Sequence, residues 1–239
     1  MIAVFLTYFI SIIIAKVAFR QVKDQNIRQI ANYGSIYSNN GFMGVPLAQG
    51  LFGSVGIFYA VASMIGFNIM SWTQGIGIFR QSKRQDWGSR LKKIILNPNI
   101  IAIIIGLLIF VTSYRLPKLL SSFINYTSPA FTPLSMIVIG SNLANLKLRD
   151  IKLPLPLWVT LFLRNLFFPI IGILLLKIMG VTGAPLLVTV ILNACPVDGL
   201  VVLFTLQTGG DARPATLLMS WSTIISLLTI PVVYWLATL

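Results

Sequence analysis

Two stretches decide the fold: residues 35–46 read Ser-Ile-Tyr-Ser-Asn-Asn-Gly-Phe-Met-Gly-Val-Pro, and residues 192–199 read Leu-Asn-Ala-Cys-Pro-Val-Asp-Gly. Each places polar residues, glycine and proline inside a run of apolar residues. Because proline removes a backbone donor and glycine lowers the cost of unwinding, each stretch predicts an interrupted helix. Unwound backbone at bilayer depth is tolerated only where it faces protein or a hydrated cavity.

Apolar runs like those around the interruptions recur along the whole chain. The 239 residues are 56% hydrophobic and 10% charged, whereas soluble proteins are about 25% charged. About 20 apolar residues cross a membrane as a helix, and the runs lack the alternation of a β-barrel strand. We therefore predict an all-α membrane protein with about eight transmembrane helices. Their expected ranges are Met1–Phe19, Ile30–Phe52, Val55–Phe79, Ile94–Tyr114, Leu119–Leu146, Leu153–Met179, Ala184–Leu206 and Ala215–Leu239.

The net charge of +13 follows from Lys and Arg in the short connections between these runs, which argues against a nucleic-acid partner. Alternate connections hold thirteen basic residues on one side and three on the other. Because basic loops stay cytoplasmic, both termini are expected outside the cytoplasm of a plasma or inner membrane. A single cysteine and no histidine argue against a metal site or a cofactor.

The two interrupted helices occupy matching places. Each follows one uninterrupted span and precedes another that carries a tryptophan beside Ser or Thr, namely Trp72-Thr73 and Trp221-Ser222. In the alternating topology they run in opposite directions, which predicts an inverted-repeat transporter with two broken crossover helices. The predicted divisions are residues 1–79 with crossover helix 30–52, the basic cytoplasmic loop 80–93, and residues 94–239 with crossover helix 184–206.

The interruptions supply the candidate substrate site. Where a helix restarts, its free N–H groups attract an anion, and at the other half-helix end free carbonyls and amide side chains hold polar groups. The predicted substrate-binding residues are Asn39, Asn40, Gly41, Gly44, Pro46, Asn193 and Pro196.

Asp198 is the one carboxylate deep in an apolar run. A buried carboxylate in lipid is costly and marks function by default, so Asp198 either couples transport to a proton or sodium ion or hydrogen-bonds the broken backbone. Arg164 is expected to pair with Asp198, with a substrate carboxylate, or with the structure around it. Asn68 and Ser222 are substrate contacts or polar contacts between helices.

Residues Asn40-Gly41-Phe42-Met43-Gly44-Val45-Pro46-Leu47 and Trp72-Thr73-Gln74-Gly75, with Asn97-Pro98-Asn99-Ile100-Ile101 and Pro196 in support, resemble the auxin efflux carrier family, which includes bacterial malate and malonate permeases. The resemblance implies ten helices in two inverted repeats, crossover helices bent at proline, an elevator-like movement, a small organic anion as substrate and a homodimer. The eight predicted spans match the last eight of that family, so the first two helices are expected to be absent.

The resemblance favours a secondary transporter for malate, malonate or an auxin-like weak acid. The alternative is a truncated, transport-inactive or accessory membrane fragment of such a carrier. An intramembrane aspartyl protease using Asp198 and Asp211 is a weaker rival, because the Gly-x-Gly-Asp arrangement is missing. No nucleotide-binding GxxxxGK[ST] loop is present either. We therefore predict a transporter and not an enzyme.

Overall fold

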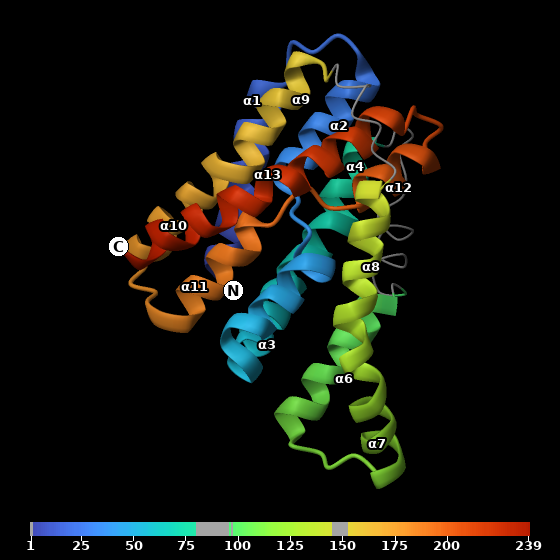
Figure 1. Ribbon diagram of the computed structural model, residues 1–239, viewed down its shortest axis with the longest axis vertical. Coiled ribbons are helices and arrows are strands. Elements are labelled where there is room, and N and C mark those ends of the chain that lie inside the picture. Colours follow the sequence, from blue (N-terminus) through green and yellow to red (C-terminus); the bar gives the residue numbers. More distant parts are fainter. Residues whose placement is uncertain (1, 80–95, 97, 145–152) are drawn as a thin grey trace.

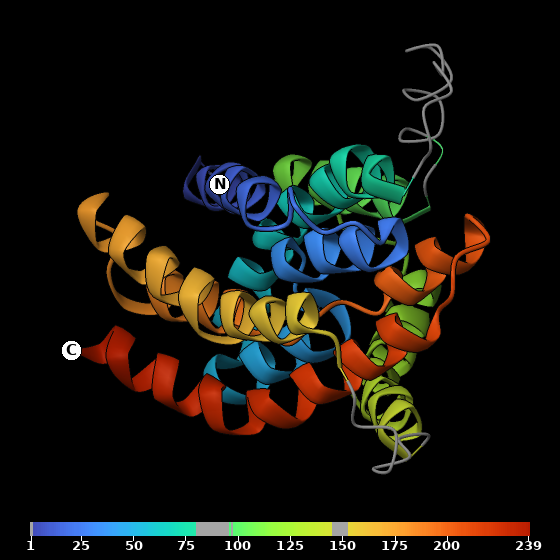
Figure 2. The same ribbon diagram turned by 90° about the horizontal axis from the view of Figure 1, so that it is seen from above.

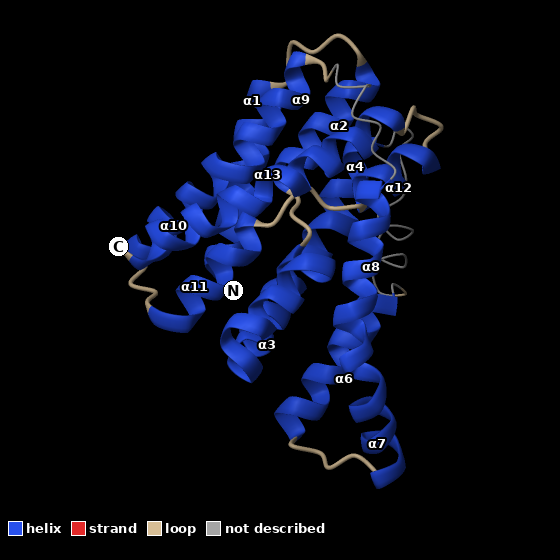
Figure 3. Cartoon of the chain, viewed as in Figure 1, coloured by secondary structure: helices blue, strands red, loops and turns tan. Residues whose placement is uncertain are grey.

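The described part of the protein is built from helices. A computed structural model describes residues 2–79, 96, 98–144 and 153–239. Within these ranges the chain forms helices, connecting loops and one isolated backbone bridge, and no strand (Figure 3). The prediction of an all-α chain is confirmed, whereas the predicted loop 80–93 lies outside the described residues.

The helices follow one another with several short π-helical or 3₁₀ turns between them. In chain order they are α1 (Ile2–Ala18), α2 (Gln25–Ile36), the π turn η1 (Asn40–Gly44), α3 (Val45–Met70), the π turn η2 (Ser71–Gly75), α4 (Ile76–Phe79), α6 (Pro98–Thr112), α7 (Lys118–Thr127), the 3₁₀ turn η3 (Ser128–Ala130), α8 (Phe131–Ala144), α9 (Leu155–Phe162), the π turn η4 (Leu163–Phe167), α10 (Phe168–Ile178), α11 (Gly183–Ala194), α12 (Leu200–Gln207) and α13 (Arg213–Thr238).

Three helical segments are long and apolar enough to cross a membrane: Asn40–Phe79, Leu155–Ile178 and Arg213–Thr238. The first of them is kinked at Gly53, whose backbone is not helical (φ 57°, ψ −138°). Two shorter apolar helices, Ile2–Ala18 and Gly183–Ala194, fall below that length. The second of these is short because its span breaks before α12. The total of about eight spans therefore stays a prediction.

The two interrupted segments lie in the middle of the molecule. α2 contacts α1, α9 and α13, and α11 contacts α3, α10 and α13. Seen from above, α2 lies between α1 and α13 (Figure 2). α6, α7 and α8 form a separate group beside α3, with α7 projecting away from the rest (Figure 1).

The connections lie on different sides of the molecule. The α1–α2 connection, the start of α9 and the α12–α13 connection lie in the upper part of the view, the α10–α11 connection lies at the left and the α6–α7 connection at the bottom (Figure 1). The first group carries the basic residues Arg20, Lys23 and Arg213.

The first interruption lies earlier than Pro46. α2 ends at Ile36, Tyr37 is extended (φ −102°, ψ 120°), and the helix restarts at Asn40. Pro46 is the second residue of α3, a place where the missing N–H is tolerated. The π turn directly before Pro46 loosens the backbone that its ring would otherwise crowd. Pro46 thus shapes the restart of the helix and does not cause the break.

The second interruption is set by its proline. Pro196 disfavours helical dihedrals in the preceding residue, and Cys195 accordingly ends α11 with φ −59° and ψ 148°. The chain resumes as a helix at Leu200. Four extended or turning residues, Pro196 to Gly199, are thereby freed to contact other parts of the chain.

A third proline shapes the segment beside the breaks. Pro169 lies just after the π turn η4, which carries Arg164 and Asn165. Because a proline clashes with the carbonyl four residues before it, the wider turn relieves the contact with Asn165. The same turn directs both polar side chains into the buried centre, where Arg164 is 2% and Asn165 0% exposed.

Candidate functional site

The two breaks meet and are hydrogen-bonded to each other. Ser38 and Val197 form an antiparallel bridge. On one side of it the Asn39 amide donates to the Pro196 carbonyl at 2.8 Å, and on the other the Asp198 amide donates to the Tyr37 carbonyl at 3.1 Å. Each break therefore satisfies the backbone groups of the other, which buried and unpaired would cost about 1–3 kcal/mol each.

Arg164 binds the helix ends that lead into both breaks. Its guanidinium donates to the carbonyls of Ser35 (3.3 Å) and Ile36 (2.8 Å) at the end of α2, and to the Asn193 carbonyl at the end of α11. Carbonyl ends of helices carry partial negative charge, so one buried cation stabilises two of them. Among the described residues no ion pair joins Arg164 to Asp198, and the guanidinium is directed at backbone carbonyls.

Ser222 and Asn165 hold the second break in place. The Ser222 hydroxyl accepts from the Val197 amide at 2.9 Å and donates to Asn165 Oδ1 at 2.7 Å. Asn165 Nδ2 in turn donates to the Ser222 carbonyl at 2.8 Å. The Ser222 hydroxyl makes both of these hydrogen bonds within the protein, so Ser222 has a structural role. We call the place where the two breaks meet, at Ser38 and Val197, the crossing.

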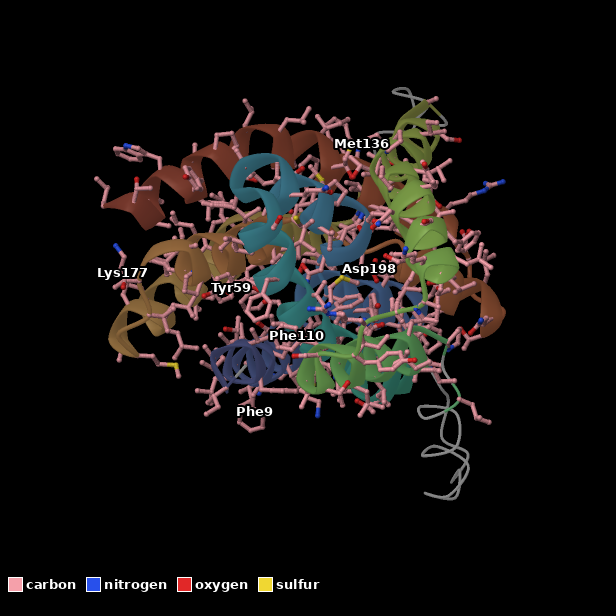
Figure 4. The ribbon with its side chains drawn as sticks, turned by 90° about the horizontal axis from the view of Figure 1, so that it is seen from below. Phe9, Tyr59, Phe110, Met136, Lys177 and Asp198 are labelled. Carbon is pink, nitrogen blue, oxygen red and sulfur yellow. The ribbon has the colours of Figure 1, made fainter. Side chains whose placement is uncertain are left out.

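A pocket of about 340 Å³ lies on one side of the crossing. It combines residues of both breaks with α3, α6 and α8, and Figure 4 places Asp198 at the centre of the molecule between the ribbons of α3 and α8. The lining residues are Asn39, Gly41, Phe42, Met64, Phe67, Asn68, Ala102, Phe131, Asp198 and Leu200. A volume near 300 Å³ or above is typical of small-molecule sites.

Three polar side chains line this largely apolar pocket. The Asn39 side-chain oxygen accepts from the Phe42 amide at 3.2 Å, which leaves its NH₂ group as a donor. Asn68 donates to the Met64 carbonyl at 2.9 Å, which leaves its oxygen as an acceptor. Asp198, 5% exposed, accepts from the Tyr33 hydroxyl at 3.1 Å.

The predicted site residues divide into two groups. Asn39, Gly41, Asn68 and Asp198 line the pocket, whereas Asn40, Gly44, Pro46, Arg164, Asn193, Pro196 and Ser222 do not. The residues outside the pocket belong to the two breaks or to the segments packed against them.

The residues outside the pocket have identifiable contacts. Asn40 lies between Ser38 and the Tyr8 hydroxyl. Gly44 faces Leu192, and a Cβ at Gly172 would lie 2.9 Å from Asn193 Nδ2, so that side chain points toward α10.

Sequence reasoning missed Tyr33 and Asn165. Tyr33 is fully buried, and its hydroxyl contacts both Asp198 (3.1 Å) and Ser71 Oγ (2.8 Å). Tyr37 follows four residues later, directly after the end of α2, and the centroids of the two rings are 4.6 Å apart. Two features of the sequence could have pointed to these residues: the four-residue spacing of Tyr33 and Tyr37, and the position of Asn165 four residues before Pro169.

Asp198 and Asp211, on which the protease alternative depends, lie apart from each other. Asp198 lies just before α12 and Asp211 after its end, where Asp211 Oδ1 accepts from the Arg213 amide. The eight residues of α12 rise by about 12 Å, whereas a proton-sharing carboxylate pair lies about 3 Å apart. The two aspartates cannot act on one water.

Comparison with known proteins shows the family of the chain. The model of a family described as membrane transport protein matches residues 1–234. A protein named only as an uncharacterized transporter, from Methanothermobacter thermautotrophicus (strain Delta H), is 27% identical over 195 residues, or 81% of this chain. The matched region spans 63% of the length of that relative. This chain is a multi-pass membrane protein and belongs to the membrane transport protein family, which is that of the auxin efflux carriers.

Proposed function

We propose that this protein is a secondary carrier for a small organic anion, and that the anion binds in the pocket beside the crossing. The observation that carries the proposal is the convergence of Asn39, from the first break, and Asp198, from the second, on one 340 Å³ pocket. Membership of the transport family supports it. A hydrated pocket between broken helices is the usual place for a transporter's substrate.

The pocket favours a monocarboxylate with an apolar body over malate or malonate. Its described lining contains no Lys or Arg, and its one charged side chain is the carboxyl of Asp198. Phe42 and Phe131 stack at the pocket wall with ring centroids 6.5 Å apart. A dicarboxylate would bring two negative charges to this site with no cation to match them, whereas the aromatic surface suits an auxin-like weak acid.

The two breaks run antiparallel to each other at Ser38 and Val197, as they would in two oppositely oriented repeats. We propose two oppositely oriented repeats within about eight spans, basic connections in the cytoplasm, and both termini outside a plasma or inner membrane. A homodimer belongs to the same proposal and rests on the family resemblance alone.

Replacing Asn39 with leucine is expected to raise the KM for an aromatic monocarboxylate about tenfold to hundredfold. A hydrogen bond to a charged group is worth roughly 1.5–3 kcal/mol, and leucine removes the free NH₂ donor. The measurement is uptake of labelled phenylacetate and of labelled malate by proteoliposomes, with phenylacetate the better substrate.

The matched control is Asn125→Leu, since Asn125 is exposed on α7, away from the pocket. Normal uptake by Asn39→Leu, with the protein monodisperse, would contradict the proposed site. Faster uptake of malate than of phenylacetate would contradict the substrate class.

A further inference from the structure

Asp198 also contacts a buried hydroxyl group, that of Tyr33, which does not line the pocket. The Tyr33 hydroxyl lies 3.1 Å from Asp198 Oδ2 and 2.8 Å from Ser71 Oγ. Tyr33 and Ser71 are both 0% exposed, and neither lines the pocket. The three groups therefore form a short buried chain that begins at the pocket and ends at η2.

This chain can serve the carboxyl group in either protonation state. A hydroxyl both donates and accepts. With Asp198 ionised, Ser71 donates to Tyr33 and Tyr33 donates to the carboxylate. With Asp198 protonated, the carboxyl group donates to Tyr33 and Tyr33 donates to Ser71. The heavy atoms can keep their positions in both protonation states. Backbone amides alone could not serve both states, because an N–H group can only donate.

The surroundings of Asp198 suit a proton better than a sodium ion. Sodium needs several oxygen ligands. Besides the carboxyl group itself, the described side-chain oxygens that the site offers are the Tyr33 hydroxyl, which donates to Asp198, and the Asn68 amide oxygen in the pocket lining. A single proton on the carboxyl group needs no such set of ligands.

The other titratable or charged side chains near the crossing that are described below make hydrogen bonds to groups other than Asp198. Arg164, from η4, donates to backbone carbonyls. The Tyr37 hydroxyl lies 2.5 Å from Gln74 Oε1 and 2.9 Å from the Met70 carbonyl oxygen, and its single proton is shared between these two acceptors. The Tyr8 hydroxyl, from α1, accepts from Asn40 Nδ2 at 3.4 Å. Asp198 consequently faces an incoming anion without a counter-charge.

We infer that Asp198 takes up a proton when the anion binds, so that the protein carries the anion and the proton together. The inference rests on the proposed function. Two carboxylates that share a buried site do not both stay ionised. The proton is taken up from the buffered aqueous solution and adds to a carboxyl oxygen of Asp198. Tyr33 and Ser71 are positioning residues for that carboxyl group.

The test is the affinity of the purified protein for phenylacetate as a function of pH, measured by calorimetry in detergent. Ordinary carboxyls titrate near pH 4, so over roughly pH 6–9 the ligand itself stays ionised. Linkage of one proton to one anion predicts that affinity falls about tenfold per pH unit above a midpoint. Asp198→Asn, which mimics the protonated side chain, is expected to bind with no dependence on pH.

The positioning residues give a separate readout. Because a hydrogen bond to the carboxylate is stronger than one to the neutral acid, Tyr33→Phe should move the midpoint to higher pH and keep the slope. Ser71→Ala should shift it in the same direction by less. A role in folding alone would lower the amount of active protein and leave the midpoint in place, which would overturn the assignment of these two residues.

The outcomes separate the two proposals. Binding by wild type with equal affinity at every pH would overturn proton uptake and leave the carrier proposal standing. Loss of binding when choline replaces sodium would also overturn it in favour of a sodium ion. No binding of phenylacetate at any pH would contradict the proposed substrate class, and with it the inference.

Discussion

Replacing Arg164 with methionine should lower the free energy of unfolding by about 3–5 kcal/mol. Each hydrogen bond from a charged group is worth roughly 1.5–3 kcal/mol, and Arg164 donates to three carbonyls. The cost of burying the guanidinium offsets part of that sum. For a chain of this size the melting temperature should fall by roughly 10 °C.

The measurement is thermal unfolding in detergent, followed by loss of the monodisperse species. Arg164→Lys should fall between wild type and Arg164→Met, because it keeps the charge but not the planar fork of donors. Lys177→Met is the matched control, since Lys177 is exposed at the periphery on α10 (Figure 4). Equal stability of Arg164→Met and wild type would show that the guanidinium does not join the two breaks.

Gly44→Val should destabilise the protein by about 2–3 kcal/mol and abolish transport. A Cβ at Gly44 would lie 2.8 Å from Leu192 Cδ2 and 3.4 Å from Cys195 Sγ. Leu192 is 1% exposed and has no free space into which to move. Overfilling a close contact of this kind usually costs 1–3 kcal/mol, and here it pushes η1 away from the end of α11.

Gly50→Val provides the same chemical change six residues further on. Gly50 is exposed on α3, and a Cβ there would meet nothing within 4 Å. Valine also has a slightly better helix propensity than glycine, so this variant should match or exceed wild type in thermal unfolding and in uptake. Equal behaviour of the two valine variants would contradict the close approach of η1 and α11.

Much of the fold could be read from the sequence because lipid imposes simple rules. Long apolar runs in a chain with few charges leave helices as the available structure. Pro196 and the polar residues around Asn39 marked both breaks, since such residues inside an apolar run need a structural reason. Asp198 could be singled out on the same ground, and it lines the pocket.

Other parts depended on contacts between segments far apart in the chain. Arg164 and Ser35 are separated by 129 positions, and Tyr33 and Asp198 by 165. Local pattern carries no information about such pairs. Pro46 was expected to interrupt the helix, but a proline near the start of a helix is compatible with it. The unwound residues lie before Pro46.

The central claim is that the two breaks cross at Ser38 and Val197, and a disulfide between these positions tests it most directly. Residues opposite each other between the two bonds of an antiparallel bridge have Cα atoms about 4.5 Å apart, within the range for a disulfide.

The experiment oxidises Ser38→Cys/Val197→Cys, with Cys195→Ala to remove the native thiol, and identifies the linked peptides by mass spectrometry. The control pairs Ser38→Cys with Thr238→Cys, which lies 16 residues along α13 from Ser222 and so roughly 24 Å beyond the crossing. We expect near-complete linkage for the first pair and none for the control. A first pair that stays reduced in folded protein, or links no better than the control, would contradict the crossing and the pocket built on it.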